Sequence, residues 1–535
     1  MRPSKSKEKR ARPVMFQGTS SHVGKSVLAA AVCRILARRG LRVAPFKAQN
    51  MALNSHVTAS GGEIGVAQAF QAEAAGAEPT VDMNPVLLKP TGEAASQVVI
   101  HGRAHGVMSA AEYHAFKAHA RAFVLESYQR LSGEYDVIVM EGAGSPAEIN
   151  LREGDIANMG AAELAGSPVV IIGDIDRGGV FASLVGTMEL LAPSERARVR
   201  GFIINKFRGD PALLAPGLEM LTARTGVEVL GVVPYIGDVL LPDEDSVALE
   251  GRARGTGAPE GRAGAGVVRV AVVRLPRISN FTDFDPLRCE PGVEVVFAAE
   301  PAVLAGADLV IIPGSKNTIA DLGWLTERGF AGAIEVHRRG GGMVAGVCGG
   351  FQMLGARLSD PLGVDSGAAG AAGVVDGLGM IDAETVMGSE KRTYRVAATA
   401  LVPGTGERVD VRGYEIHTGE TVVRGAPFST LTRRGGEAVR LSDGAVSSDG
   451  LVWGTYIHGL FDNDRFRGLL LGLLRRRKGA EGAEGRPVAG VSFGAVRSGA
   501  MERLADVVEE NLDVERLFGI IGLTTACGRA GAGLP

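Results

Sequence analysis

A glycine-rich loop near the start of the chain has the residues of a phosphate-binding site. Its sequence is Gly18-Thr-Ser-Ser-His-Val-Gly24-Lys25-Ser26, between a short apolar run and a segment with helical apolar spacing. Unpaired backbone N–H groups and the positive end of the helix dipole at such a helix start bind phosphate. We expect Lys25 to reach the β- and γ-phosphates of ATP and Ser26 to ligate Mg²⁺. Thr19 replaces the first glycine of the usual pattern, and an ordinary glycine turn is the alternative.

Polar side chains at or near the ends of predicted strands are candidates for the same site. Glu141 follows an apolar run and is placed to hold Mg²⁺ directly or through water, although it could instead cap a helix. Lys47 also ends a strand, where its ammonium could stabilise a transferring phosphoryl group or could simply lie over the sheet surface. Asn205 is a candidate for binding the purine edge of ATP. Asp155 is a further acid of the predicted catalytic site.

A second candidate site centres on Cys348. An apolar strand leads into Cys348-Gly-Gly, and a helix follows. This order is typical of a nucleophile elbow, in which the helix dipole favours the thiolate, although most buried cysteines are inert packing residues. We expect the N–H groups of Gly349 and Gly314 to bind an oxyanion. His458, at the end of another apolar strand, is the candidate base, and His417 is the alternative.

Near-continuous apolar runs alternate with helical segments in both halves of the chain. The predicted strands include residues 135–140, 168–172, 201–205 and 229–233 in the first half, and 293–297, 309–312 and 343–347 in the second. Such strands are typical of parallel sheets covered by helices on both faces. The sequence therefore predicts an α/β fold of two three-layer domains with mainly parallel sheets. Ligands are expected at the carboxyl ends of the strands.

A Gly/Ala-rich stretch with few residues to bury separates the two halves. We interpret residues 251–266 as a linker between a first domain at 13–250 and a second at 267–515. Residues 1–12 form a basic run that is expected to be a disordered tail. The last residues, 516–535, are expected to be a frayed C-terminal tail.

The composition limits the kind of partner. The chain has 535 residues, 45% of them hydrophobic and 22% charged, with a net charge of −3. This charge gives no signal for nucleic acid, and no apolar stretch has the length of a membrane span. The four cysteines are scattered without metal-ligand spacing, which favours a reducing cytoplasm. The composition therefore gives no signal for a nucleic-acid or membrane partner, and the oligomeric state stays open.

Motifs of the first domain resemble known enzymes. The long loop with its shifted glycine, the strand ending in Lys47 and the Glu141-Gly-Ala-Gly turn resemble dethiobiotin synthetase and its relatives. In that family, ATP phosphorylates a carboxylate-type group. Three further stretches resemble the cobyric acid synthase family of the cobalamin pathway: Lys47-Ala-Gln-Asn-Met-Ala-Leu-Asn-Ser55, Glu63-Ile-Gly-Val-Ala-Gln68 and Asn84-Pro-Val-Leu-Leu-Lys-Pro90.

The second domain resembles the class I glutamine amidotransferases, which release ammonia from glutamine through a cysteinyl thioester. The commonest ending in those enzymes is His-Pro-Glu, whereas this chain has His458-Gly-Leu. The cobyric acid synthase branch is similar in lacking the glutamate. The third member of the catalytic group therefore stays open, and Glu415 is a candidate only for shaping the glutamine pocket.

The resemblance implies a complete reaction. Ammonia from glutamine would amidate the b, d, e and g carboxylates of adenosylcobyrinic acid a,c-diamide after ATP·Mg²⁺ has phosphorylated them. The nearest alternative is cobyrinic acid a,c-diamide synthase, against which the Gln49–Asn54 stretch argues. A CTP synthase-like amidation fits the glycine pattern of the loop less well. A partition-type ATPase switch is an alternative of another class, but it has no use for Cys348.

Overall fold

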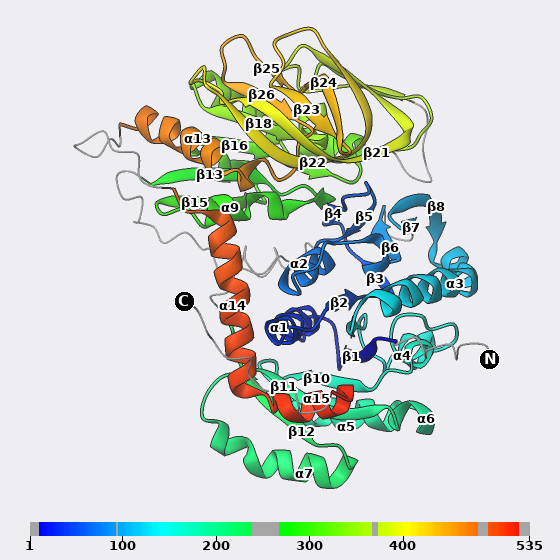
Figure 1. Ribbon diagram of the computed structural model, residues 1–535. Coiled ribbons are helices and arrows are strands. Elements are labelled where there is room, and N and C mark those ends of the chain that lie inside the picture. The colour runs from blue at the N-terminus through cyan, green and yellow to red at the C-terminus, as the bar shows by residue number, and fades with distance from the viewer. Residues whose placement is uncertain (1–9, 92–94, 238–266, 366–372, 480–489, 524–535) are drawn as a thin grey trace, which may run out of the picture.

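Two parallel sheets, one in each half of the chain, organise the structure, which is a computed structural model (Figure 1). It describes residues 10–91, 95–237, 267–365, 373–479 and 490–523. The predicted linker at 251–266, residues 1–9 of the predicted tail and residues 524–535 lie outside this range. Within it, Ala11 is buried and Arg12 opens the first strand, so the ordered domain begins slightly earlier than predicted. No helix of the described residues is long and apolar enough to cross a membrane.

The first sheet has the order β12-β11-β10-β1-β9-β2, and all its neighbouring strands are parallel. Helices cover both faces, and each face has its own apolar core. The strands are β1 (Arg12–Gly18), β2 (Val43–Phe46), β9 (Val137–Glu141), β10 (Val169–Asp174), β11 (Val199–Phe207) and β12 (Val229–Pro234), and the helices are α1 (Lys25–Arg38), α2 (Val66–Ala74), α3 (Ala110–Glu134), α4 (Met159–Ala165), α5 (Val180–Leu190), α6 (Pro193–Arg196) and α7 (Ala215–Thr225). The predicted three-layer α/β arrangement is confirmed for this domain.

The second sheet has the order β15-β13-β16-β18-β26-β25 and is parallel except for the pairing of β25 with β26. Its strands are β13 (Val268–Val273), β15 (Val293–Ala298), β16 (Leu309–Ile312), β18 (Met343–Val347), β25 (Ala445–Val446) and β26 (Val452–Thr455). Its helical segments are η4 (Phe281–Phe284), α9 (Asp285–Arg288), α10 (Thr318–Glu327), α11 (Phe330–Arg339), α12 (Gly349–Leu354) and α13 (Asp464–Arg477).

Smaller sheets, which the sequence analysis did not predict, lie beside the two parallel ones. A mostly antiparallel sheet in the second domain contains β19 (Arg357–Asp360), β20 (Gly373–Asp376), β21 (Ala383–Leu401), β22 (Arg408–Val423), β23 (Ser429–Arg434) and β24 (Glu437–Asp443). The first domain contains a four-stranded sheet of β3 (Gln49–Met51), β6 (Val86–Pro90), β7 (Ala95–Ile100) and β8 (Arg103–Ser109). It also contains the antiparallel pair β4 (Ser55–Val57) and β5 (Glu63–Gly65). In the second domain, β14 (Ile278–Ser279) pairs with β17 (Gly314–Ser315). In Figure 1, β4 and β5 lie at the junction between the two domains.

The chain returns to the first domain at its C-terminal end. Helix α14 (Phe493–Asn511) runs from the second domain along α1, as the red helix of Figure 1 shows, and α15 (Val514–Ile521) packs below it. Leu517 and Phe518 lie in the core of the first domain with Val14 and Phe16 of β1. The predicted tail from residue 516 is therefore wrong for residues 516–521. The apolar residues of α15 follow helical spacing (Val514, Leu517, Phe518, Ile521), a signal that the sequence analysis overlooked.

Replacing Leu517 by alanine should destabilise the first domain. Leu517 is 1% exposed, so its truncation leaves a cavity in a close-packed core. We expect a loss of about 2–4 kcal/mol in the free energy of unfolding, measured by urea denaturation. Leu213→Ala is the matched control, because Leu213 is 82% exposed and its truncation should change stability by less than about 0.5 kcal/mol. Equal stability of Leu517→Ala and the control would contradict the packing of α15.

Candidate active sites

The loop between β1 and α1 requires glycine at two positions. A Cβ on Gly18 would lie 2.4 Å from Val23 Cγ2, and a Cβ on Gly24 would lie 2.2 Å from Asn205 Nδ2. Gly24 also has φ = 99°, a conformation that favours glycine. The loop therefore folds tightly over the end of β1. Thr19 is held there by a hydrogen bond of 3.0 Å from its N–H to the carbonyl of Ile172.

Lys25 lies inside this loop, at the wall of a large cavity of about 620 Å³. Its Nζ donates hydrogen bonds to the carbonyl oxygens of Ser20, at 2.9 Å, and Gly144, at 3.0 Å. The side chain is 7% exposed. An ammonium group at the start of a helix is placed to bind phosphate oxygens.

Glu141 is the centre of a buried polar cluster beside Lys25. Its Oε1 accepts hydrogen bonds from Ser26 Oγ at 2.7 Å and Lys47 Nζ at 3.1 Å, and its Oε2 accepts one from Gln71 Nε2 at 2.8 Å. Burial disfavours the carboxylate, but Lys47 and the hydrogen bonds outweigh it and hold the pKa of Glu141 below its usual range. The structure thus brings together Lys25, Ser26, Lys47 and Glu141, all predicted from the sequence.

Asp155 borders the cavity, whereas Asn205 lies beneath the phosphate-binding loop. The Asp155 carboxylate accepts hydrogen bonds from the backbone N–H groups of Ala157, Asn158 and Gly160, at 2.8, 3.0 and 2.9 Å, which fixes the start of α4. Asp155 borders the cavity, and its catalytic role stays a prediction. Asn205 lies beneath the loop, where its Nδ2 donates to the Val23 carbonyl at 2.7 Å and the residue is 5% exposed. Its role in binding a purine stays a prediction.

In the second domain, Cys348 occupies a sharp turn between β18 and α12. Its backbone has φ = 52° and ψ = −110°, which is a strained conformation for a residue with a side chain. The turn is held by a hydrogen bond of 2.8 Å from the Cys348 N–H to the carbonyl of Thr455. A Cβ on Gly350 would lie 1.9 Å from the Ile312 carbonyl oxygen, so the Cys-Gly-Gly sequence fits this close approach. This geometry is that of a nucleophile elbow.

The two predicted oxyanion glycines lie beside this turn. A Cβ on Gly349 would be 3.0 Å from Ser315 N, which places the start of α12 against β17. A Cβ on Gly314 would be 3.4 Å from His458 Cε1. The structure therefore gathers Gly314, Gly349, Cys348 and His458 at the carboxyl ends of β16, β18 and β26.

His458 is held between a carboxylate and the nucleophile. Its Nδ1 lies 2.7 Å from Asp283 Oδ2, and Cys348 is a second neighbour that raises its pKa. The Cys348 thiol itself donates a hydrogen bond to the Ile416 carbonyl at 3.3 Å. The second carboxylate oxygen of Asp283 accepts the N–H of Gly459 at 3.1 Å. Burial lowers the pKa of His458, but the Asp283 carboxylate and Cys348 outweigh it and raise the pKa to about 10. An acid, a base and a thiol in this order can activate the sulfur as a nucleophile.

Comparison with known proteins agrees with both sites. Residues 14–246 match the CobQ/CobB/MinD/ParA nucleotide binding domain, and residues 269–466 match the CobB/CobQ-like glutamine amidotransferase domain. A cobyric acid synthase of Syntrophobacter fumaroxidans is 50% identical over 96% of this chain and 99% of its own length. One of Sorangium cellulosum is 52% identical over 96% and 99%, and one of Photorhabdus laumondii is 49% identical over 94% and 97%. The chain belongs to the cobyric acid synthase family. It is a glutamine amidotransferase with a nucleotide-binding domain.

Asp283 is the functional residue that the sequence analysis missed. It lies in η4, 175 residues before His458, and no motif near His458 points to it. The family lacks the usual acid two positions after the histidine, and in this chain Leu460 occupies that position. The side chain of Asp283 supplies a carboxylate to His458 from a different segment. Its position after the first strand of the second domain is the weak signal that the sequence contained.

His417 is not positioned as the base. Its Nδ1 lies 2.8 Å from the Gly419 carbonyl, and its ring stacks on Tyr456 with centroids 3.8 Å apart. Burial lowers its pKa to about 3. Glu415 is used in an ion pair with Arg434 at 2.9 Å. Of the two candidate histidines, His458 is the one that joins an acid to Cys348.

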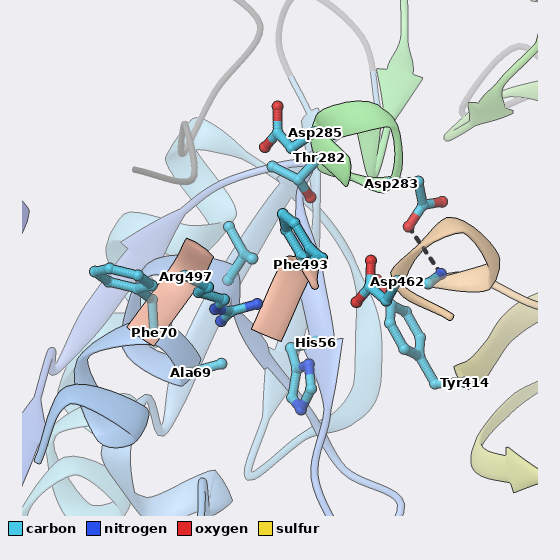
Figure 2. Close-up of a pocket in the computed structure, with 12 residues that line it drawn as sticks. His56, Ala69, Phe70, Thr282, Asp283, Asp285, Tyr414, Asp462, Phe493 and Arg497 are labelled. Atoms are coloured by element: carbon cyan, nitrogen blue, oxygen red, sulfur yellow. Dashed lines mark hydrogen bonds between the residues drawn. The ribbon is translucent and has the colours of Figure 1, made fainter. Parts of the chain in front are cut away.

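A small cavity of about 70 Å³ adjoins Asp283 at the junction of the domains (Figure 2). Figure 2 shows Asp283, Asp462 and Tyr414 on one side and Arg497 of α14 with Phe70 on the other. Burial, with the neighbouring Asp283, raises the pKa of Asp462 to about 7. The environment of Asp283 is therefore built from both domains and from the C-terminal helix.

Replacing Asp283 by asparagine should slow glutamine hydrolysis by about 10², because a positioned base contributes this much and an amide cannot hold the imidazolium. The carboxylate raises the pKa of His458, so the imidazolium persists to high pH in the native enzyme. Its loss lowers that pKa, and the alkaline limb of the pH profile should move to lower pH. Glutamate release measured against pH tests both effects.

Asp285→Asn is the control for this prediction. Asp285 lies two residues further along and pairs with Arg288 at 3.1 Å. Its replacement should leave the position of the alkaline limb unchanged. If the Asp283→Asn enzyme kept the native rate and pH profile, the proposed role of the Asp283 carboxylate in glutamine hydrolysis would be excluded.

Proposed function

We propose that this protein is an ATP- and glutamine-dependent ligase that converts the b, d, e and g carboxylates of adenosylcobyrinic acid a,c-diamide into carboxamides in cobalamin biosynthesis. The observation that carries the proposal is the presence of two complete sets of groups in one chain. Lys25, Ser26 and Glu141 surround the cavity of the first domain, and Cys348 with His458 forms the elbow site of the second. Membership of the cobyric acid synthase family supplies the substrate class.

The second domain would release ammonia from glutamine. Cys348 Sγ attacks the side-chain carbonyl carbon, and the N–H groups of Gly349 and Gly314 stabilise the oxyanion. His458 donates its proton to the leaving nitrogen, so that ammonia departs and a thioester remains. Water, deprotonated by His458, then hydrolyses the thioester to glutamate and restores Cys348. Asp283 keeps the imidazole in the required orientation throughout.

The first domain would activate the carboxylate. A substrate carboxylate oxygen attacks the γ-phosphorus of ATP, ADP leaves, and ammonia then displaces phosphate from the acyl phosphate to give the amide. Lys25 holds the β- and γ-phosphates, and Lys47 stabilises charge on the phosphoryl group in transfer. Gly18, Thr19 and Gly24 shape the loop around the phosphates. Asp155, which borders the same cavity, would position reacting groups there.

Ser26 and Glu141 fit a Mg²⁺ site. Their oxygen atoms lie 2.7 Å apart at the cavity, and Mg²⁺ usually takes one or two protein oxygens together with phosphate and water. The ion would neutralise negative charge on the β- and γ-phosphates. Glu141 keeps its charge when buried, because Lys47, Ser26 and Gln71 contact it. The proposed partners are thus ATP, Mg²⁺, glutamine and the corrinoid, in a cytoplasmic enzyme.

Replacing Cys348 and Lys25 separately should distinguish ammonia release from carboxylate activation. Cys348→Ala should abolish amidation with glutamine but leave amidation with free ammonium, since only the ammonia supply is lost. Lys25→Ala should reduce amidation from either nitrogen source by at least 10², because both need the activated carboxylate. Loss of both activities in Cys348→Ala, or ammonium-driven amidation at the native rate in Lys25→Ala, would contradict this division.

Mass spectrometry of corrin acids tests the substrate. The protein is incubated with ATP, Mg²⁺ and glutamine, and either cobyrinic acid or adenosylcobyrinic acid a,c-diamide is supplied. Four successive mass decreases of about 1 Da from the diamide are expected, because each replacement of OH by NH₂ changes the mass by that amount. Consumption of cobyrinic acid to the diamide alone would instead identify the a,c-diamide enzyme. ATP hydrolysis with neither corrin acid consumed would favour a partition-type switch.

A further inference from the structure

One short segment of the first domain reaches both active sites. Gln49, Asn50 and Met51 of β3 line the large cavity that we assign to ATP. Three residues later, Asn54 and Ser55 contact the turn of the second domain that carries Asp283. The segment Gln49–Ser55 belongs to a sequence motif to which the reaction itself assigns no role beyond Lys47.

The contact between Asn54–Ser55 and the turn consists of two reciprocal hydrogen bonds. The Ser55 N–H donates to Asn280 Oδ1 at 3.0 Å, and the Phe281 N–H donates to Asn54 Oδ1 at 3.2 Å. Asn54 is 0% and Asn280 3% exposed. Removing either amide leaves a buried N–H without this acceptor, which is costly. We call these two bonds the asparagine clamp.

The clamp holds the first residues of η4, where Asn280 adopts φ = 52° and Phe281 begins the helical turn. Asp283 lies two residues further on and contacts His458 Nδ1 at 2.7 Å and Gly459 N at 3.1 Å. A one-turn helix whose first residues have no side-chain cap depends on such external contacts for its position. The position of the Asp283 carboxylate is therefore set in part by the first domain.

A ring contact connects the same two domains to His458. His56, which follows Ser55, lies against Tyr414 with centroids 5.6 Å apart, and Tyr414 stacks on His458 at 5.3 Å and 16°. Figure 2 shows His56 and Tyr414 on neighbouring sides of the cavity beside Asp283. The imidazole of His458 is thus contacted through Asp283 and through Tyr414, and both routes begin at residues 54–56.

Further hydrogen bonds tie this segment to the ATP side. Asn50 Nδ2 donates to Gln68 Oε1 at 3.0 Å, and Asn84 Nδ2 donates to the Lys47 carbonyl at 3.1 Å. Asn84 Oδ1 in turn accepts the N–H of Gly65 at 3.1 Å. The three stretches that resemble the family therefore form one buried network, which extends from Lys47 at Glu141 to the asparagine clamp.

We propose that Asn54 is a positioning residue for glutamine hydrolysis, which acts through the turn carrying Asp283 and makes the amidotransferase site dependent on the segment that lines the ATP cavity. The inference rests on the proposed function for the identity of the two sites. Its consequence is that binding in the first domain, by shifting residues 49–55, changes the alignment of Asp283 and His458. Ammonia release then responds to occupancy of the ATP cavity.

The test compares three rates in the full-length Asn54→Ala enzyme. Glutamate release with glutamine, amide formation with glutamine, and amide formation with ammonium are measured with ATP, Mg²⁺ and the corrinoid present. We expect the first two to fall together by about tenfold, with about one glutamate still formed per amide, and ammonium-driven amidation to stay within about twofold of the native rate. Asn280→Ala, which removes the clamp from the other side, should behave in the same way.

Thr393→Val is the matched control. Thr393 Oγ1 makes another hydrogen bond between the domains, to the Gly61 carbonyl at 2.6 Å, but it does not touch the turn of Asp283. Its replacement should leave glutamate release within about twofold of native. A tenfold loss in this control would mean that any weakening of the domain contact slows hydrolysis, and the specific role of Asn54 would be rejected.

Two further readouts separate positioning from a merely structural role. The alkaline limb of glutamate release in Asn54→Ala should move to lower pH, as in Asp283→Asn, and the double variant should be no slower than Asp283→Asn alone. Additive losses, or an unmoved pH profile, would overturn the proposal. If Asn54→Ala released glutamate at the native rate but formed less amide, the clamp would serve only to retain ammonia between the sites, and the positioning role would be rejected. Because glutamate is measured directly, an error in the corrinoid assignment would leave this comparison intact.

Discussion

Parallel strand pairing is the constraint on which both sites depend. Because all strands of the first sheet run in the same direction, Gly18, Glu141 and the residue after β2 end on one rim, and the loop, the acid and Lys47 meet there. The second sheet repeats this with β16, β18 and β26, whose ends supply Gly314, Cys348 and His458. Residues far apart in the chain, such as Ser26 and Glu141 at a separation of 115 positions, thereby become neighbours. The side chains then need only short loops to reach their partners.

Buried charge is the second physical theme, and each case is compensated by named partners. Glu141 is surrounded by Lys47, Ser26 and Gln71. At the junction of the domains, Glu63 is contacted by Lys89 from its own domain and by Lys391 of β21, the latter at 2.5 Å. Such pairs contribute little net stability because desolvation opposes their attraction, but breaking one partner away is costly. The Glu63 cluster therefore favours one relative position of the domains, the position in which Asn54 faces Asn280.

Much of this arrangement could be predicted from the sequence, for reasons that differ between the parts. The parallel strands are recognisable in the sequence as apolar runs. Lys25, Ser26, Glu141 and Cys348 lie at or shortly after the ends of such runs, so their positions could be predicted from the local pattern. Asp283 could not be found in this way, because its partner His458 is distant in the chain and only the tertiary fold joins them. The antiparallel strands β21 and β22 alternate polar with apolar residues over partly exposed surfaces, and their signal is weaker.

The C-terminal helices α14 and α15 complete the core of the first domain, although they are synthesised after the second domain. Helix α14 joins α1 through Arg38 and Asp506 at 2.6 Å and through Arg39 and Glu509 at 2.8 Å, and α15 completes the core behind β1. The first domain made by the ribosome thus lacks part of its interior until the last residues of the chain have emerged. Its final packing waits for the amidotransferase half to be translated. A first domain without α14 and α15 would leave part of its apolar core uncovered, because residues of both helices lie in that core.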